Sequence, residues 1–273
     1  MAYHLEAFPF SHTTILTNLH PDHLDWHADV ESYYRSKINL LGRTKQLILY
    51  PESLLSQFPE VRDFPLQSVV LPAQLEIMDF LITLAPGIML DISDRQLFGY
   101  HNYCNIYFAA SVALFLGISV TTLSRILPTI SALPHRLQKI SDHGRKIWID
   151  DSKSTTAQAL YAALGAFAPS KVYLIAGGKD KGDPFEGLVT RLTDNCAGLV
   201  AIGETAHTFL QASHEAFVPA VAVADMTEAV HYLSENTKEG DIILLSPGCS
   251  SLDMYTNYAE RAERFAAAIH GLE

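Results

Sequence analysis

The stretch KIWIDDSK, Lys146 to Lys153, joins a short apolar run directly to a cluster of charged and hydroxyl residues. The apolar run favours a buried β-strand. Residues 156–167 then carry a helical pattern, with Ser154 and Thr155 available as N-caps. A strand that leads at once into a helix is the first half of a βαβ unit, so this stretch predicts a parallel α/β sheet.

The chain downstream repeats this alternation of strand and helix. The apolar patterns predict strands at 171–176, 198–202, 219–223 and 241–246, and helices at 184–193, 205–212, 226–236 and 255–270. Just upstream, Arg136 to Ile140 and Lys146 to Ile149 predict a hairpin that turns at residues 142–144. Residues 133–273 are therefore predicted to form a Rossmann-like domain whose parallel sheet is covered on both faces.

Residues 1–132 have a more mixed pattern and are predicted to form a separate domain, with a boundary near residue 132. A strand at 13–18 and a helix at 30–41, capped by Asp29, come first. A strand at 47–50 follows, and Pro51 can open a helix at 52–57. The remaining pattern predicts β-segments at 68–71, 77–84 and 88–92 and helices near 102–116 and 121–130.

Composition limits the classes of function. The 273 residues are 48% hydrophobic and carry a formal charge of −11, which argues against a nucleic-acid-binding or anionic-membrane surface. No apolar run reaches the roughly 20 residues of a membrane span, and no secretory signal is recognisable. The cysteines, Cys104, Cys196 and Cys249, are too widely spaced for a CxxC site, so we expect a reducing cytoplasm.

Polar residues follow the predicted strands where each strand ends. In parallel α/β sheets, ligands bind outside the carboxyl ends of the strands, so we expect these residues to converge on an anion-binding site. Each motif also has a simpler reading: a helix cap at Ser154 or Thr155, a salt-bridging hinge at His135–Arg136, and a plain turn at 177–182, which matches neither the Walker nor the GxGxxG pattern. The converging segments are 150–153, 177–181, 203–204 and 247–251.

Two polar motifs lie in the first half of the chain. His20 to Lys37 reads HPDHLDWHADVESYYRSK, which is either a polar loop with a helix cap or a source of metal ligands. Asn102 and Asn105 are three residues apart in a predicted helix and therefore share one face. Capping explains Asn102, whereas an amide at Asn105 inside an apolar helix needs a partner.

Taken in order, these motifs resemble the Mur ligases of peptidoglycan synthesis, and among them the glutamate-adding type. The resemblance runs from residue 3 to about 269. The matching residues are Tyr3–Glu6, Thr17–Asn18, Pro21–Asp25, Lys37, His101–Asn102, Asn105, His135–Arg136, Asp151–Lys153, Gly177–Gly178, Lys181, Ser246–Ser251, Asp253, Asn257–Tyr258, Glu260–Arg261 and Phe265.

The resemblance implies roles for some of the matching positions and for a few of their neighbours. His23 would bind Mg²⁺, and Lys37 would be the lysine that is carbamylated to give an oxygen ligand for that metal. His23, Lys37 and Arg136 would be catalytic, with Arg136 on the terminal phosphate of ATP. The nucleotide-binding residues would be Asn102, Asn105, His135, Arg136 and Asp151. The incoming amino acid would be held by Lys153, Thr155, Lys181, Ser251, Leu252 and Tyr258, of which Tyr258 replaces an expected Phe.

The implied reaction is the addition of D-glutamate to UDP-N-acetylmuramoyl-L-alanine through an acyl phosphate formed with ATP and Mg²⁺. The family's Walker-type loop and metal-binding Glu have no counterpart here, so we expect a partial central domain at 1–132, an inactive chain, and self-association through unpaired sheet edges. Two alternatives remain open. One is another Mur ligase or a folylpolyglutamate synthetase, and the other is a non-catalytic remnant that binds nucleotide, glutamate or a partner.

Overall fold

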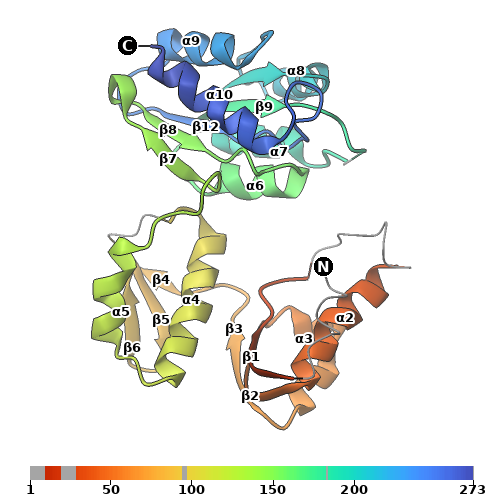
Figure 1. Ribbon diagram of the computed structural model, residues 1–273, viewed down its shortest axis with the longest axis vertical. Coiled ribbons are helices and arrows are strands. Elements are labelled where there is room, and N and C mark those ends of the chain that lie inside the picture. The colour runs from red at the N-terminus through yellow and green to blue at the C-terminus, as the bar shows by residue number, and fades with distance from the viewer. Residues whose placement is uncertain (1–9, 20–28, 94–96, 183, 273) are drawn as a thin grey trace. The chain divides into compact units, whose positions relative to one another are not determined.

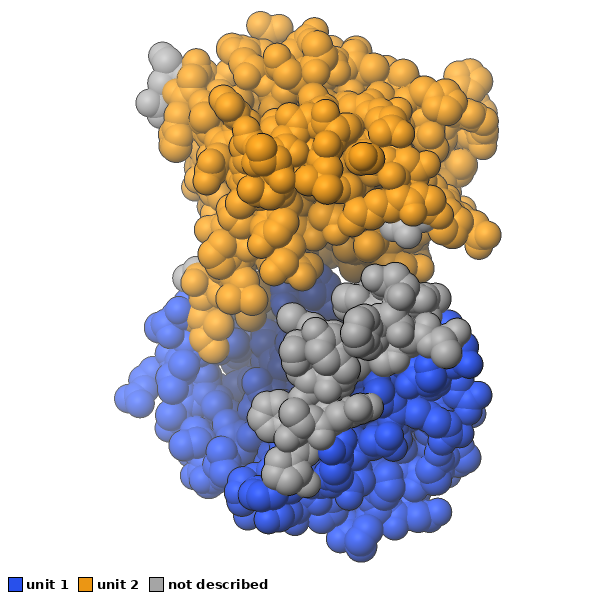
Figure 2. All heavy atoms as spheres, turned by 45° about the vertical axis from the view of Figure 1, so that its right-hand side comes forward, with its two compact units in different colours: residues 1–95, 101–129 blue, residues 96–100, 130–273 orange. Residues whose placement is uncertain are grey.

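The computed structural model describes residues 10–19, 29–93, 97–182 and 184–272. The chain divides into two compact units, which Figure 2 shows in different colours. Unit 1 comprises residues 1–95 and 101–129, and unit 2 comprises residues 96–100 and 130–273. The short segment 96–100 thus belongs with unit 2, where Phe98 packs against Phe167 with 5.4 Å between ring centroids.

A six-stranded sheet forms the centre of unit 2, in the order β11-β10-β9-β12-β8-β7. Neighbouring strands run parallel except at the edge, where β7 pairs antiparallel with β8 in the predicted hairpin. The predicted α/β fold class is confirmed. The strands are β7 (Gln138–Ser141), β8 (Ile147–Asp150), β9 (Val172–Gly177), β10 (Cys196–Ile202), β11 (Ala220–Ala222) and β12 (Ile242–Leu245).

Helices cover both faces of this sheet, as Figure 1 shows. Residues of α6, α7 and α8 share one core cluster with the sheet, whereas residues of α9 and α10 share another. Side chains alternate between the two faces, as in Leu174 and Ile175 of β9, because successive residues of a strand point to opposite sides. The helices are α6 (Ala157–Gly165), α7 (Leu188–Asn195), α8 (Ala206–Glu215), α9 (Met226–Asn236) and α10 (Tyr258–His270).

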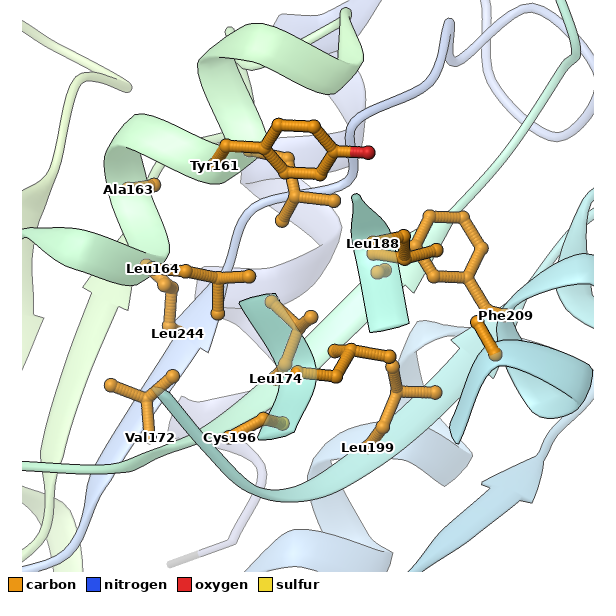
Figure 3. Close-up of a cluster of buried hydrophobic side chains, with 14 of the residues drawn as sticks. Tyr161, Ala163, Leu164, Val172, Leu174, Leu188, Cys196, Leu199, Phe209 and Leu244 are labelled. Carbon is orange, nitrogen blue, oxygen red and sulfur yellow. The ribbon is translucent and has the colours of Figure 1, made fainter. Parts of the chain in front are cut away.

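The cluster that contains more residues surrounds the central strands β9 and β12 (Figure 3). Leu174 and Leu244 contribute from the strands, and Phe209 reaches in from α8; all three are fully buried. On the opposite face Trp148 packs against Phe265 at 6.0 Å between ring centroids. Burial of these apolar surfaces supplies the main driving force for folding of unit 2.

Polar side chains mark where the helices of unit 2 begin. The Asp225 carboxylate accepts the Glu228 N–H at the start of α9, and the Asn257 side chain accepts two N–H groups at the start of α10. The cap of α6 is Thr156, whose hydroxyl accepts the Ala159 N–H. The prediction that Ser154 or Thr155 caps this helix is therefore wrong by one or two residues.

Unit 1 contains a parallel sheet in the order β1-β2-β3. Asp29 caps α2 in a reciprocal capping box with Ser32, as predicted for the cap residue. Pro51 is the last residue of β2 rather than the first of a helix; a proline at a strand end loses no ladder hydrogen bond within that strand. The elements are β1 (Ser11–Ile15), α2 (Val30–Gly42), β2 (Thr44–Pro51), α3 (Leu54–Gln57), the 3₁₀ turn Pro59–Asp63 and β3 (Gln67–Leu71).

A small antiparallel sheet, β4-β5-β6, completes unit 1 together with α4 and α5. The Tyr107 hydroxyl on α4 donates to the Val70 carbonyl at 3.3 Å and ties this part to β3. No helix among the described residues is long and apolar enough to cross a membrane. The bounds are β4 (Ile77–Met78), β5 (Leu81–Ala85), β6 (Ile88–Asp91), α4 (Tyr100–Phe115), α5 (Val120–Ile126) and the 3₁₀ turn Leu127–Thr129.

Several large apolar side chains of unit 1 are exposed. On the small sheet Met78 is 69% exposed and Phe80 is 53% exposed, and Phe10 and Ile15 are exposed at β1. Scattered exposed apolar side chains are normal on a soluble domain, whereas a contiguous patch marks an association surface. Self-association through unit 1 therefore stays a prediction.

Two phenylalanines, one within α8 and one just after it, test the contribution of burial in unit 2. Phe209 is fully buried, whereas Phe217 is 95% exposed. We expect Phe209→Ala to lower the free energy of unfolding by about 3–5 kcal/mol through lost burial and a cavity. The control Phe217→Ala should change it by less than about 0.5 kcal/mol. Urea denaturation followed by circular dichroism measures both, and similar losses in the two variants would contradict this account of the core.

Candidate functional site

Four loops meet at the carboxyl edge of the unit 2 sheet, as the sequence predicts. The turn after β9 and the loop after β12 form a two-bond backbone bridge: the Lys179 N–H donates to the Ser250 carbonyl at 2.8 Å, and the Ser250 N–H donates back at 3.2 Å. The Gly177 N–H also donates to the Pro247 carbonyl. The polar residues that follow separate strands are therefore held side by side.

Two consecutive glycines make this approach sterically feasible. Gly177 and Gly178 have φ values of +113° and +139°. A Cβ on Gly177 would lie 2.1 Å from the Ile202 carbonyl oxygen, and one on Gly178 would lie 2.3 Å from the Ser250 carbonyl oxygen. Any side chain would force these loops apart, so the Gly–Gly pair is required by close packing of the backbone.

His135 and the end of β8 form the second part of the site. His135 Nδ1 lies 2.7 Å from the Asp150 carboxylate, and the Lys153 N–H donates to the His135 carbonyl at 3.2 Å. The backbone of His135 has φ +62°, a conformation that is costly for a non-glycine residue. These contacts tie the His135–Arg136 joint to unit 2. The exposed Arg136 side chain remains available to an anion.

Asp151 lies beneath this joint and is almost fully buried. Its carboxylate accepts the Leu137 N–H at 3.2 Å and the Ser246 hydroxyl at 2.9 Å. Burial raises the pKa of Asp151 to about 7, while these hydrogen bonds and the nearby Arg136 lower it by less than burial raises it. A buried carboxyl that titrates near neutrality is a frequent property of ligand sites.

The residues predicted to hold an amino acid line the same edge. The Lys153 ammonium lies 5.7 Å from the centroid of the Tyr258 ring, and this ring meets His135 edge-on at 6.0 Å. Ser251 is buried within its loop, whereas Leu252 is 60% exposed. Thr155 is half-buried, and Lys181 is exposed on the turn after β9. Ammonium and hydroxyl groups at one edge suit carboxylate ligands.

Arg261 is the main structural residue for which the sequence analysis predicted no role. Its side chain on α10 has no exposed surface, and its guanidinium donates to the carbonyl oxygens of Cys249 and Ser152. Burial lowers the pKa of Arg261 to about 10, which still leaves it protonated at neutral pH. Arg261 is among the residues that match the Mur ligases in the sequence analysis, but a single arginine in a helical pattern carries no local signal of such long-range bonds, so only the fold reveals this structural role.

Two further side chains hold the turn after β10. The Thr205 hydroxyl accepts the Gly178 N–H at 3.1 Å and lies 3.3 Å from the Cys249 sulfur. The Asp253 carboxylate accepts the Glu204 N–H at 2.9 Å. Burial raises the pKa of Cys249 to about 11, so this thiol acts as a packing group rather than a nucleophile.

The predicted site residues of unit 1 lie apart from these loops in sequence. Asn102 and Asn105 share one face of α4, where the Asn105 amide donates to the Asn102 side chain at 3.3 Å. Asn105 is exposed rather than buried, so the expected need for a buried partner does not arise. The half-buried Lys37 places its ammonium 4.3 Å from the centroid of the Tyr33 ring. His23 lies outside the described residues.

No group of three or more His, Cys, Asp or Glu residues within the described parts of the chain could hold a metal ion. The predicted Mg²⁺ site at His23 and Lys37 therefore stays a prediction. The observed contact places the Lys37 ammonium against the face of the Tyr33 ring, a cation–π arrangement. Carbamylation would have to replace this contact.

The sheet topology, with helices on both faces, defines a Rossmann-like α/β domain. Residues 135–249 match the family described as Mur ligase, glutamate ligase domain. This region therefore belongs to the Mur ligase family, and the recognition of that family from the sequence is confirmed.

Two curated relatives of the chain share the printed name UDP-N-acetylmuramoylalanine--D-glutamate ligase. The protein from Halalkalibacterium halodurans is 32% identical over 268 residues, covering 95% of this chain and 59% of the relative. The protein from Aquifex aeolicus is 33% identical over 246 residues, covering 89% and 58%. The chain thus spans somewhat less than two thirds of the length of these relatives.

Solved structures share the fold across the chain. UDP-N-acetylmuramate-alanine ligase MurC from Thermotoga maritima aligns with a TM-score of 0.71 and 16% identity, covering 100% of this chain and 62% of that one. MurF ligase from the same organism, solved in complex with ADP, aligns with a TM-score of 0.68 and 16% identity, covering 100% and 65%. At this identity the likeness establishes the fold alone.

The raised pKa of Asp151 predicts a specific pH dependence of stability. Burial keeps the Asp151 carboxyl protonated in the folded chain at pH values where it is already ionised in the unfolded chain. Between these two pKa values, a rise in pH therefore favours the unfolded state. The stabilisation from protonated Asp151 is present below pH about 4 and is lost as pH rises to about 7. We expect Asp151→Asn to remove this loss. The free energy of unfolding of the variant minus that of the parent should therefore be larger at pH 8 than at pH 4.

Urea titrations at both pH values, followed by the fluorescence of the buried Trp148 in a Trp26→Phe background, measure this difference. Glu235→Gln, which neutralises an exposed carboxylate on α9, serves as the control. Equal pH dependence in the parent and Asp151→Asn would show that Asp151 titrates normally.

Proposed function

We propose that this chain carries the glutamate-binding and part of the ATP-binding machinery of a cytoplasmic ligase in peptidoglycan synthesis. The proposed activity adds D-glutamate to UDP-N-acetylmuramoyl-L-alanine. The proposal is carried by the parallel strands β8, β9 and β12, because Lys153, Lys181 and Ser251 follow their carboxyl ends at one edge of the sheet. The printed name of the curated relatives supports the choice of substrates.

The amino-acid site suits a dicarboxylate. Lys153 and Lys181 supply positive charge from the turns after β8 and β9, and Ser251 supplies a hydroxyl from the loop after β12. The walls of the site would be formed by the hydroxyl of Thr155 and by the apolar surfaces of Leu252 and Tyr258. Charged hydrogen bonds to two carboxylates would fix the orientation of the ligand and leave its amine free to react.

In unit 2, the residues proposed for ATP binding are His135, Arg136 and Asp151. In unit 1, Asn102 and Asn105 on α4 are proposed for the same role. The Asp151 carboxyl can accept hydrogen bonds from the ribose hydroxyls, and the Arg136 guanidinium can pair with the terminal phosphate. Mg²⁺ would neutralise charge on the phosphates when bound, with His23 and Lys37 as its proposed ligands. The chemistry requires transfer of the γ-phosphoryl group to the carboxylate of the acceptor.

The amine of D-glutamate would then attack the acyl phosphate, form the new amide bond and release phosphate. The protein contributes by holding the amine against the acyl carbon and by neutralising charge on the departing phosphate. Within unit 2, Lys153 is suited to the first task and Arg136 to the second.

Binding of D-glutamate to the 273-residue chain tests the proposed amino-acid site. We expect saturable heat in titration calorimetry, and we expect Lys153→Met to weaken the affinity at least about tenfold because it removes one charged hydrogen bond. Lys171→Met is the matched control, since Lys171 directly precedes the amino end of β9, opposite the edge that carries these loops, and its ammonium bonds to the Thr193 carbonyl. Equal losses in both variants, or no binding by the parent, would contradict the site.

Turnover distinguishes a working ligase from a non-catalytic binding protein. The 273 residues contain no G-x-x-x-x-G-K-[ST] sequence, which normally cradles the phosphates in this kind of ATP site. We therefore expect binding of D-glutamate without phosphate release when ATP, Mg²⁺ and UDP-N-acetylmuramoyl-L-alanine are supplied. Acceptor-dependent phosphate release above that of a heat-treated sample would show that the chain is catalytically complete.

A further inference from the structure

Arg261 connects two of the loops that line the proposed amino-acid site. Its Nη2 donates to the Ser152 carbonyl at 2.9 Å and to the Cys249 carbonyl at 3.2 Å, and its Nη1 also donates to Cys249 at 3.2 Å. One guanidinium therefore bridges the turn after β8 and the loop after β12. The bridged residues of these two segments, Ser152 and Cys249, are 97 residues apart in the chain.

The bridged carbonyls stand directly beside ligand-binding positions. Ser152 precedes Lys153, and Cys249 precedes Ser250 and Ser251. A guanidinium is a planar and rigid fork, so a bridge through it holds the two carbonyls at a nearly fixed separation. The separation of Lys153 from Ser251 is constrained by the same bridge.

The third loop of the site lies close to the same guanidinium. A Cβ built on Gly178 would lie 3.3 Å from Arg261 Nη1, which places the turn after β9 against the arginine. The arginine itself is fixed by the start of α10, where its N–H donates to the Asn257 carbonyl and the Asn257 side chain caps the helix. Arg261 thus bonds to two of the four converging loops and lies close to a third.

Stability alone does not account for an arginine at this buried position. The Nε atom has no hydrogen-bond partner, and the charge is held by carbonyl oxygens. Burial of a charged group costs several kcal/mol, and an apolar side chain of similar volume is often as stable or more stable. A defined separation between loops is what the guanidinium provides and an apolar side chain does not.

We propose that Arg261 is a positioning residue that fixes the distance between Lys153 and Ser251, and thereby sets the length of the dicarboxylate amino acid that the site accepts. Lys153 and Ser251 hold the ligand from opposite loops. A ligand shorter by one methylene, such as D-aspartate, cannot reach both when the loops are held apart. The inference rests on the proposed function, because it assumes that these residues hold the carboxylates.

The test compares the affinities for D-glutamate and D-aspartate in Arg261→Met and Arg261→Lys. We expect the parent to favour D-glutamate, and Arg261→Met to bind D-glutamate at least about tenfold more weakly with a smaller ratio between the two ligands, since a misplacement of about 1 Å is costly. Arg261→Lys keeps the charge but only a single donor group, so it should fall between them. If Arg261→Met does not fold, the affinity ratio of Arg261→Lys is compared with that of the parent instead.

Ile269→Ala is the matched control, because Ile269 is buried on the same helix but packs in the core rather than against the loops. It should lower the melting temperature and leave the ratio of affinities unchanged. A folded Arg261→Met with the ratio of the parent would overturn the proposal, and so would an equal change of the ratio in Ile269→Ala.

Amide hydrogen exchange tests the positioning role without any ligand. The N–H groups of Lys153, Gly248 and Ser250 donate to carbonyls of neighbouring loops and report on the spacing. We expect these amides to exchange at least about tenfold faster in Arg261→Met, with amides of α9 unchanged. Failure of the parent to bind D-glutamate would count against the proposed function, whereas unchanged exchange in the variants would count against Arg261.

Discussion

Parallel alignment of the strands of unit 2 is the constraint on which the site depends. Because β8, β9, β10 and β12 run in one direction, the residue that follows each strand emerges at one edge of the sheet. Cross-loop bonds then hold these emerging segments together. The Lys179–Ser250 bridge is an example, and it requires the Gly177–Gly178 pair. The apolar alternation along the strands thus indirectly determines where the charged groups lie.

The sequence predicts periodic and local features of this protein well. The helix at 226–236 has the predicted bounds, because a clear apolar period and the capping residue Asp225 define it. Asp29 was identified as a cap for the same local reason. Convergence of the strand-end residues could also be predicted, since it follows from the sheet direction rather than from any side-chain contact.

Two kinds of feature could not be predicted in this way: contacts between residues far apart in the sequence, and positions where neighbouring residues are equally suited to one role. Pro51 suits both a strand end and a helix start, and the pairing of β2 with β3 decides between them. Ser154, Thr155 and Thr156 are all potential caps, but Ser154 is fully buried and its backbone bonds to the loop after β12. The bond of Arg261 to Ser152 spans 109 residues, and no periodic pattern in the sequence predicts it.

The environments of the cysteines offer a practical route to selective chemical labelling. Burial raises the pKa of Cys196 to about 12 and that of Cys249 to about 11, so at neutral pH both are almost entirely unreactive thiols in unit 2. Cys104 is only half-buried, on the α4 segment that carries Asn102 and Asn105. A maleimide dye added to the folded protein would therefore attach in unit 1 and give an optical signal from the helix assigned to the nucleotide.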